Sequence, residues 1–214
     1  MRHIPLVTDA VYHVYNRGVD KRKIFLRFGH YLRFTTSLRM ILNTGSATER
    51  FSQTQGSALN SKISILSYSL MPNHYHFLIK QTGDNGISEF MQKLNTSYTM
   101  YFNLNLKRTG RLFEYTFKAK PVESDELLLH VSRYMHINPV IAKLVEKPEH
   151  WRWSSYKDFL IPVAQQPIVE TKYILDQFNS IESFKKFTND QIAYALLLKR
   201  CETQDEDKLF FYPV

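Results

Sequence analysis

The sequence predicts an α+β protein built on an antiparallel sheet. Residues 11–17 are rich in β-branched and aromatic side chains and end at Gly18, which is typical of a strand. Residues 63–70 and 74–80 are also strand-like, and only the short 71–73 connection separates them, so we expect an antiparallel hairpin. Helix-like segments lie between and after these strands, and this order of elements favours an α+β domain.

Three segments carry apolar residues at helical spacing. The first covers residues 31–42 and the second residues 86–106. Ser124 is a favourable N-cap for the third, and Asn138-Pro139 should end it, because a residue before proline avoids the α region. The apolar positions are Leu32, Phe34, Leu38, Ile41 and Leu42 in the first helix, and Ile87, Phe90, Met91, Leu94, Tyr98 and Tyr101 in the second.

The remaining segments are less regular. Residues 43–61 are rich in Ser, Thr, Gly, Asn and Gln without periodicity, which predicts a loop or an insertion. Residues 112–122 could form an extended arm or an edge strand. The sequence becomes more polar and helix-prone from residue 159 onward. We therefore expect one domain over residues 1–158 and a C-terminal helical extension over residues 159–214.

Composition indicates a folded, basic protein. Of the 214 residues 43% are hydrophobic and 14% aromatic, which is enough for one sizeable core and excludes a disordered chain. Lysine and arginine number 28 against 20 acidic residues, a net charge of +8, so we expect a polyanionic partner. Charge alone does not separate DNA, RNA and an anionic membrane.

Other composition features narrow the class of protein. A single cysteine, Cys201, rules out an internal disulfide and a cysteine-rich zinc site, and we expect a cytoplasmic protein. No stretch approaches the ~20 apolar residues needed to span a bilayer, and residues 1–10 lack the apolar run of a signal peptide, so we expect no membrane partner. None of the seven glycines forms a phosphate-binding loop or a dinucleotide pattern.

Two basic clusters are candidates for contacts with nucleic acid. One follows the first strand, and the other is interleaved with Phe113, Tyr115 and Phe117. Phosphates would meet the cations, and unpaired bases could stack on the rings for ~1 to 3 kcal/mol each. The alternative is solvated surface charge beside ordinary core aromatics. The clusters are Arg17, Lys21, Arg22, Lys23 and Arg27, and Lys107, Arg108, Arg111, Lys118 and Lys120.

His74 and His76 are candidates for a metal site. Side chains alternate along a strand, so the two imidazoles project from the same face. Two nearby imidazole nitrogens could supply part of a metal site. The alternative is a half-buried histidine pair that is hydrogen-bonded to neighbouring residues. His13 could face the same site, although we expect an ordinary hydrogen-bonded strand histidine there.

Tyr134 and Asn138 are candidates for the remaining chemistry. Their spacing puts them on one face of the last helical turn before Pro139. A phenol beside an amide oxygen could supply a nucleophile and a third metal ligand together. The alternative is a core tyrosine and a helix-ending Asn-Pro pair, because most of the 13 tyrosines must simply pack.

Four ordered motifs make a family resemblance specific. Residues 71–79, MPNHYHFLI, resemble the His-hydrophobic-His strand of IS200-like transposases. Residues 133–140, RYMHINPV, resemble the tyrosine helix of the REP-associated tyrosine transposases, a group of HUH-type enzymes. YHVYNRG at 12–18 and GRLFE at 110–114 also match, and WSSY at 153–156 stands where such proteins carry a similar segment. The resemblance spans residues 5–158.

The resemblance implies a ferredoxin-like antiparallel sheet with packed helices, the histidines on a central strand and the tyrosine helix across it. It implies that His74 and His76 bind a divalent cation, Mg²⁺ or Mn²⁺, that Asn138 completes the protein ligands, and that Tyr134 is the nucleophile. Such a cation keeps open positions for phosphate oxygens and acts on the scissile phosphate as a Lewis acid.

The implied activity is cleavage and rejoining of single-stranded or hairpin DNA, as in DNA transposition. Attack by Tyr134 would leave a phosphotyrosine on the 5′ phosphate and a free hydroxyl, and a second hydroxyl could reverse the step without ATP. The resemblance leaves monomer and homodimer open. Two alternatives remain: a non-catalytic protein that binds DNA hairpins, and a metal-dependent RNA-processing nuclease.

Overall fold

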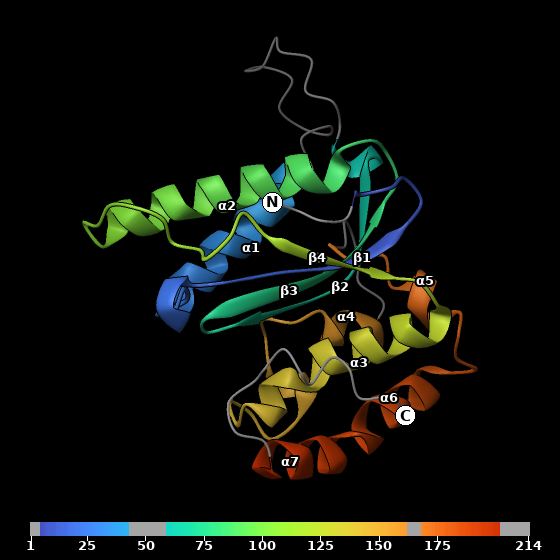
Figure 1. The fold of residues 1–214 in the computed structure, drawn as a ribbon. Coiled ribbons are helices and arrows are strands. Elements are labelled where there is room, and N and C mark those ends of the chain that lie inside the picture. Colours follow the sequence, from blue (N-terminus) through green and yellow to red (C-terminus); the bar gives the residue numbers. More distant parts are fainter. Residues whose placement is uncertain (1–4, 43–58, 162–167, 202–214) are drawn as a thin grey trace.

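A four-stranded antiparallel sheet forms the centre of the fold (Figure 1). The computed structural model describes residues 5–42, 59–161 and 168–201. The strand order β2-β3-β1-β4, with helices α1 and α2 in the two crossovers, is the ferredoxin-like arrangement and confirms the predicted fold class. The strands are β1 (Val11–Arg17), β2 (Ile63–Met71), β3 (His74–Gln81) and β4 (Lys118–Val122).

Helices α1 (Phe28–Leu42) and α2 (Gly86–Asn105) cover one face of the sheet (Figure 1). The alternation of β3 sends Tyr75 and Phe77 into this layer, where both are fully buried. The apolar stripe predicted for α2 is buried apart from the half-buried Tyr101. On α1, Phe34 and Leu38 are buried as predicted, whereas Leu32 has 48% of its surface exposed. His30, Tyr31 and Ser37 complete the buried stripe.

Helix α3 (Asp125–Ile141) packs on the opposite face (Figure 1). As predicted, Ser124 caps it, its hydroxyl oxygen accepting a hydrogen bond from the Leu127 amide at 3.1 Å. The prediction that Pro139 ends the helix was wrong, because α3 continues through the proline to Ile141. Pro139 removes one backbone donor, but the Ala142 amide still reaches the Asn138 carbonyl at 2.8 Å. Burial of the last turn stabilises this continuation.

The C-terminal helices pack beside α3. They are α4 (Tyr156–Leu160), α5 (Lys172–Leu175), α6 (Ile181–Asp190) and α7 (Ile192–Cys201). Phe159, Ile174 and Phe184 are buried in the same apolar cluster as Leu66 and Leu78 of the sheet. This part of the chain therefore contributes core side chains. In the described residues no helix is long and apolar enough to cross a membrane.

Short segments complete the fold. In the described part of the chain, the 3₁₀ turns η1 (Val19–Lys21), η2 (Leu59–Ser61) and η3 (Pro148–His150) join the larger elements. Most of the loop predicted at 43–61 lies outside the described residues. Of the segment at 112–122, the last residues form β4, at the edge of the sheet.

The WSSY segment closes the outer edge of β2. The Leu70 amide donates to the Trp153 carbonyl at 2.8 Å, and the Ser155 amide donates to the Tyr68 carbonyl at 3.0 Å. The Glu170 amide adds a bond to the Ile65 carbonyl at 2.7 Å. Backbone groups of an edge strand that would otherwise be open to another chain are thus paired within the molecule.

Candidate active site

His74 and His76 stand on β3, on the side of the sheet that faces α3. Their rings meet edge to face with centroids 4.7 Å apart, as the alternation of the strand predicts. Tyr75, between them, points to the opposite face and is fully buried. Across the strand pair, His74 lies opposite Arg17 and His76 opposite Tyr15.

Helix α3 brings Tyr134 and Asn138 to His76. The Tyr134 ring lies edge to face against the His76 ring, with centroids 5.8 Å apart. The Asn138 amide nitrogen lies 3.5 Å from His76 Nε2, and Asn138 has only 7% of its surface exposed. The helical spacing thus places both side chains on the face that packs over the histidine strand.

Each histidine of the pair uses Nδ1, its rear nitrogen, in a hydrogen bond. His74 Nδ1 lies 2.6 Å from Asn73 Oδ1, and His76 Nδ1 lies 3.0 Å from His13 Nε2. His13 is therefore part of this site. We expected an ordinary strand histidine there. His13 lies opposite Leu78, two residues from His76 on β3, and therefore on the same face of the sheet as His74 and His76.

The site holds its histidines in the neutral form. Burial, helped by the charge of Lys120, lowers the pKa of His13 to about 3. Burial, helped by Arg17, lowers the pKa of His74 to about 3. Burial lowers the pKa of His76 well below its ordinary value, with a further contribution from His74. Neutral imidazole is the form that binds metal ions.

The donor set fits a divalent cation. The rear nitrogens of His74 and His76 are engaged, so each imidazole keeps Nε2 as the atom that can bind a metal ion. The Asn138 side chain offers an amide oxygen beside them, since a half turn of an amide exchanges its oxygen and nitrogen. Within the described residues no three His, Cys, Asp or Glu side chains form a metal cluster, so the candidate ligands are two imidazoles and one amide.

A second polar cluster holds α3 on the sheet. His136 is completely buried, and its Nε2 lies 3.0 Å from Ser67 Oγ and 3.1 Å from Ser155 Oγ. The Ser155 hydroxyl also accepts a hydrogen bond from the Tyr68 amide at 2.9 Å. Burial lowers the pKa of His136 to about 3. Because these groups are sealed from solvent, they position the helix that carries Tyr134 and cannot touch a substrate.

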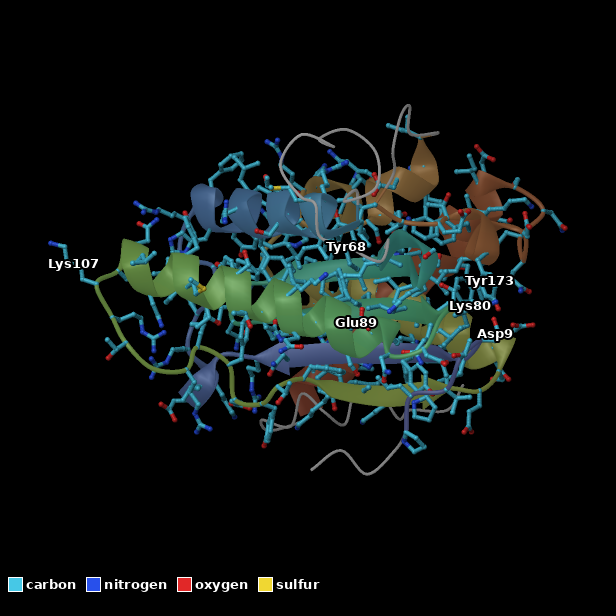
Figure 2. The ribbon with its side chains drawn as sticks, turned by 90° about the horizontal axis from the view of Figure 1, so that it is seen from above. Asp9, Tyr68, Lys80, Glu89, Lys107 and Tyr173 are labelled. Carbon is cyan, nitrogen blue, oxygen red and sulfur yellow. The ribbon has the colours of Figure 1, made fainter. Side chains whose placement is uncertain are left out.

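The two basic turns converge at the end of the sheet where His74 stands. The Val19 amide donates to the Leu112 carbonyl at 3.0 Å, which joins the turn after β1 to the segment after α2. Arg27 donates to Asn105 Oδ1 at 2.6 Å. The Gly18 amide donates to the Asn73 carbonyl at 2.8 Å, beside His74. Figure 2 shows Lys107 at this end of α2, far from Lys80 and Tyr173.

The predicted basic residues differ in what they contact. Arg17 forms an ion pair with Glu114 at 3.2 Å, and Arg22 pairs with Asp20 at the same distance. Lys118 and Lys120 lie on the edge strand β4 opposite Tyr15 and His13, which puts them on the histidine face of the sheet. They therefore extend the basic surface from the turns toward His76.

A cleft between α3 and α7 runs past Tyr134. It encloses about 80 Å³ and is lined by Tyr134, His130 and Arg133 on one side and by Tyr194 and Leu198 on the other. His130 Nδ1 lies 2.6 Å from the Arg133 guanidinium. No pattern in the sequence indicated this cleft, because it depends on where α7 packs.

Comparisons with known proteins place the chain in a class. A family model described as "Transposase IS200 like" matches residues 30–138 of the 214, which include His74, His76, Tyr134 and Asn138. The chain therefore belongs to the IS200-like transposase family, as the sequence motifs indicated.

A solved structure shares the fold. It is the "Structure of the REP associates tyrosine transposase bound to a REP hairpin", with a TM-score of 0.59 and 14% identity over 78% of this chain and 88% of that chain. No curated protein matches the sequence.

Proposed function

We propose that this transposase-family chain cleaves and rejoins single-stranded DNA at hairpin-bearing sites through a 5′-phosphotyrosine at Tyr134. The observation that supports it most is the meeting of β3 and α3, where the His76 ring lies 5.8 Å from the Tyr134 ring and its Nε2 lies 3.5 Å from the Asn138 amide. A nucleophile beside side chains able to hold a divalent cation is an arrangement suited to metal-assisted phosphoryl transfer.

A divalent cation, Mg²⁺ or Mn²⁺, is the proposed cofactor, held by His74, His76 and Asn138. When bound it supplies Lewis acidity and orients the scissile phosphate. His13 and Asn73 hold the rings of His76 and His74 from behind. Three protein ligands would leave positions at the cation for phosphate oxygens.

The covalent step is carried by Tyr134. Its phenolic oxygen forms a bond to phosphorus while the bond from phosphorus to the 3′ oxygen breaks, and that oxygen takes up a proton. Because phenols ordinarily ionise near pH ~10, the phenolic proton must pass to a base as the bond forms. Attack of a 3′ hydroxyl on the phosphotyrosine reverses the step and joins strands.

The proposed DNA surface is the basic end around His74. The converged turns and the β4 edge place cations beside the candidate site, where phosphates of a strand leading to Tyr134 would lie. Exposed Tyr115 offers a ring on which an unpaired base can stack. The residues proposed to bind DNA are Arg17, Lys21, Arg22, Lys23, Arg27, Lys107, Arg108, Arg111, Lys118 and Lys120.

We further propose that residues 1–158 carry out catalysis and that residues 159–214 modulate it. Truncation after Asp158 would remove Phe159, Ile174 and Phe184 from the core, so a point substitution tests the idea better. Tyr194→Ala, in the cleft beside Tyr134, should change the rate of adduct formation without abolishing it. Complete loss of the adduct in a folded variant would contradict this division.

The test is a gel assay with end-labelled single-stranded hairpin DNA and Mn²⁺ or Mg²⁺. The wild type should give a labelled protein band that survives denaturation, and Tyr134→Phe should give none. Tyr173→Phe is the matched control. Tyr173 is 39% exposed, and the Lys80 ammonium lies over its ring at the other end of the molecule (Figure 2). The control should form the adduct as the wild type does.

The two alternatives give different results in the same assay. A metal-dependent RNA-processing nuclease would cut a matched RNA hairpin and leave no adduct, because water is its nucleophile. A non-catalytic binding protein would retain the DNA hairpin without cutting it. Cleavage that persists in Tyr134→Phe without an adduct would overturn the phosphotyrosine proposal.

A further inference from the structure

The rear nitrogens of the two site histidines have different partners. His74 Nδ1 faces a side-chain oxygen, that of Asn73, at 2.6 Å. His76 Nδ1 faces another imidazole nitrogen, His13 Nε2, at 3.0 Å. In a neutral imidazole one nitrogen carries the proton and the other a lone pair, so these partners decide which nitrogen of each histidine can act as a ligand atom.

The hydrogen bond between His74 Nδ1 and Asn73 Oδ1 can have only one donor. An amide oxygen only accepts, so His74 Nδ1 must carry the proton and donate it. The orientation of Asn73 is itself fixed, because its amide nitrogen donates to the Lys21 carbonyl at 3.4 Å, where an oxygen would be repelled. The lone pair of His74 is therefore left on Nε2.

The His13 contact can run in either direction, and its surroundings favour one. In the chain without metal the Asn138 amide nitrogen faces His76 Nε2 at 3.5 Å, and an amide nitrogen only donates, so Nε2 carries the lone pair. The amide offers its oxygen to a cation only after a half turn. His76 Nδ1 then carries the proton and donates it to His13 Nε2. His13 is only 2% exposed, and stacking on Tyr15 at 4.8 Å holds its ring in place.

We propose that His13 and Asn73 are positioning residues that fix the tautomers of His76 and His74, so that each histidine keeps its lone pair on Nε2 and that of His76 faces Asn138. This inference rests on the proposed metal-dependent function for its purpose, but the tautomers themselves are a property of the chain. Neither residue touches the substrate. Each acts through the histidine behind which it lies.

The first measurement reads the tautomers in the full-length chain with ¹⁵N-labelled histidine and no metal. His74 and His76 should both show a protonated Nδ1 and an unprotonated Nε2 in ¹H–¹⁵N correlation spectra. Their signals are identified by their disappearance in His74→Asn and His76→Asn. A wild-type His76 protonated on Nε2 would overturn the assignment to His13, whatever the protein does to DNA.

The second measurement compares substitutions of His13. His13→Gln keeps an acceptor behind His76, whereas His13→Leu removes it at similar volume. Mn²⁺ affinity measured by calorimetry should fall about 10- to 100-fold in His13→Leu and stay near the wild-type value in His13→Gln, the range typical of residues behind a metal ligand. Circular dichroism shows whether each variant is folded.

The outcomes separate this inference from the proposed function. Equal Mn²⁺ affinity in folded His13→Leu and wild type would refute a positioning role, and so would an equal loss in both variants. A wild type with the expected tautomers that forms no DNA adduct would refute the proposed function and leave the tautomer assignment standing. Asn73→Asp and Asn73→Leu give the same comparison for His74, because aspartate keeps the acceptor.

Discussion

The two faces of the central sheet are buried by different chemistry. Under α1 and α2 most buried side chains are aromatic or aliphatic, with Phe34, Phe77 and Phe90 fully enclosed, and His30 and Ser37 of α1 are the polar exceptions on that helix. Under α3 the layer is apolar at one end, around Leu78 and Met135, and polar toward His74. Adjacent residues of β3 thus serve the two purposes alternately.

The difference shows what distinguishes a site from a core in this molecule. The hydroxyls of Tyr75 and Tyr98 are used within the core, where they donate to Asn95 Oδ1 at 2.8 Å and to the Ile24 carbonyl at 2.6 Å. On the other face His13 and His76 bond to one another, and His76 keeps its second ring nitrogen toward Asn138, with its ring against that of Tyr134. Burial stabilises both faces, but among the described residues only the second brings imidazole nitrogens together with Tyr134 and Asn138.

The largest expected contrast comes from neighbouring residues of β3. Phe77→Ala should lower the free energy of unfolding by about 3–5 kcal/mol, because it leaves a cavity between the sheet and helices α1 and α2. His76→Ala should abolish the DNA adduct in a protein that stays folded, because it removes a proposed metal ligand. Guanidinium denaturation and the adduct assay on both variants measure the contrast. Normal adduct formation by His76→Ala would refute the proposed role of His76 as a metal ligand.

Acid should weaken the α3 face in particular. The pKa values of His13 and His136 are about 3 in the folded chain, below the ordinary 6.5, so the unfolded chain binds more protons between these values. Stability is therefore fully present above pH 6.5 and falls as the pH drops, by up to about 1.4 kcal/mol per pH unit for each histidine.

Denaturation curves at several pH values measure this slope, and His136→Leu provides the control. It removes one of the buried histidines whose pKa is lowered and should make stability depend less steeply on pH. An unchanged slope in this variant would mean that His136 takes up its proton in the folded chain as readily as in the unfolded chain.

Removing one hydroxyl should loosen α3 without reaching the substrate. Ser155→Ala leaves the Tyr68 amide and the His136 ring short of a partner and should cost about 1–3 kcal/mol of unfolding free energy. Thr96→Ala, at an exposed position of α2, is the control and should change stability little. Adduct formation by Ser155→Ala should persist below its melting temperature; complete loss there would give the cluster a direct role in chemistry.

The smallest effect expected is on DNA affinity. Lys118→Gln and Lys120→Gln remove cations from the histidine face of β4. Each phosphate that is no longer neutralised should reduce the slope of log affinity against log salt by about 0.7 for a single strand. Fluorescence titration of a labelled hairpin measures the slope. Lys93→Gln, at an exposed position of α2, is the control. Equal slopes in all variants would place the DNA elsewhere.

Much of the fold could be predicted because its signals are local. The alternation in β3, the short hairpin turn and the Ser124 cap each involve residues close in the chain, and all appear as predicted. The end of α3 was mispredicted for the same reason. The local preference before Pro139 is outweighed by burial of Val140 and Ile141, which the sequence around the proline does not reveal.

From the sequence alone we could predict the first three strands, the helices that join the elements, the family, and the residues that carry candidate chemistry. Their types and spacing follow from periodicity and motif, which act within a few residues. Three contacts became apparent only once the chain was folded. His13 meets His76 across 63 residues, His76 meets Asn138 across 62, and the two basic turns share one end of the sheet. These distances result from packing whole elements over a common core, since no single local preference fixes where two remote side chains meet.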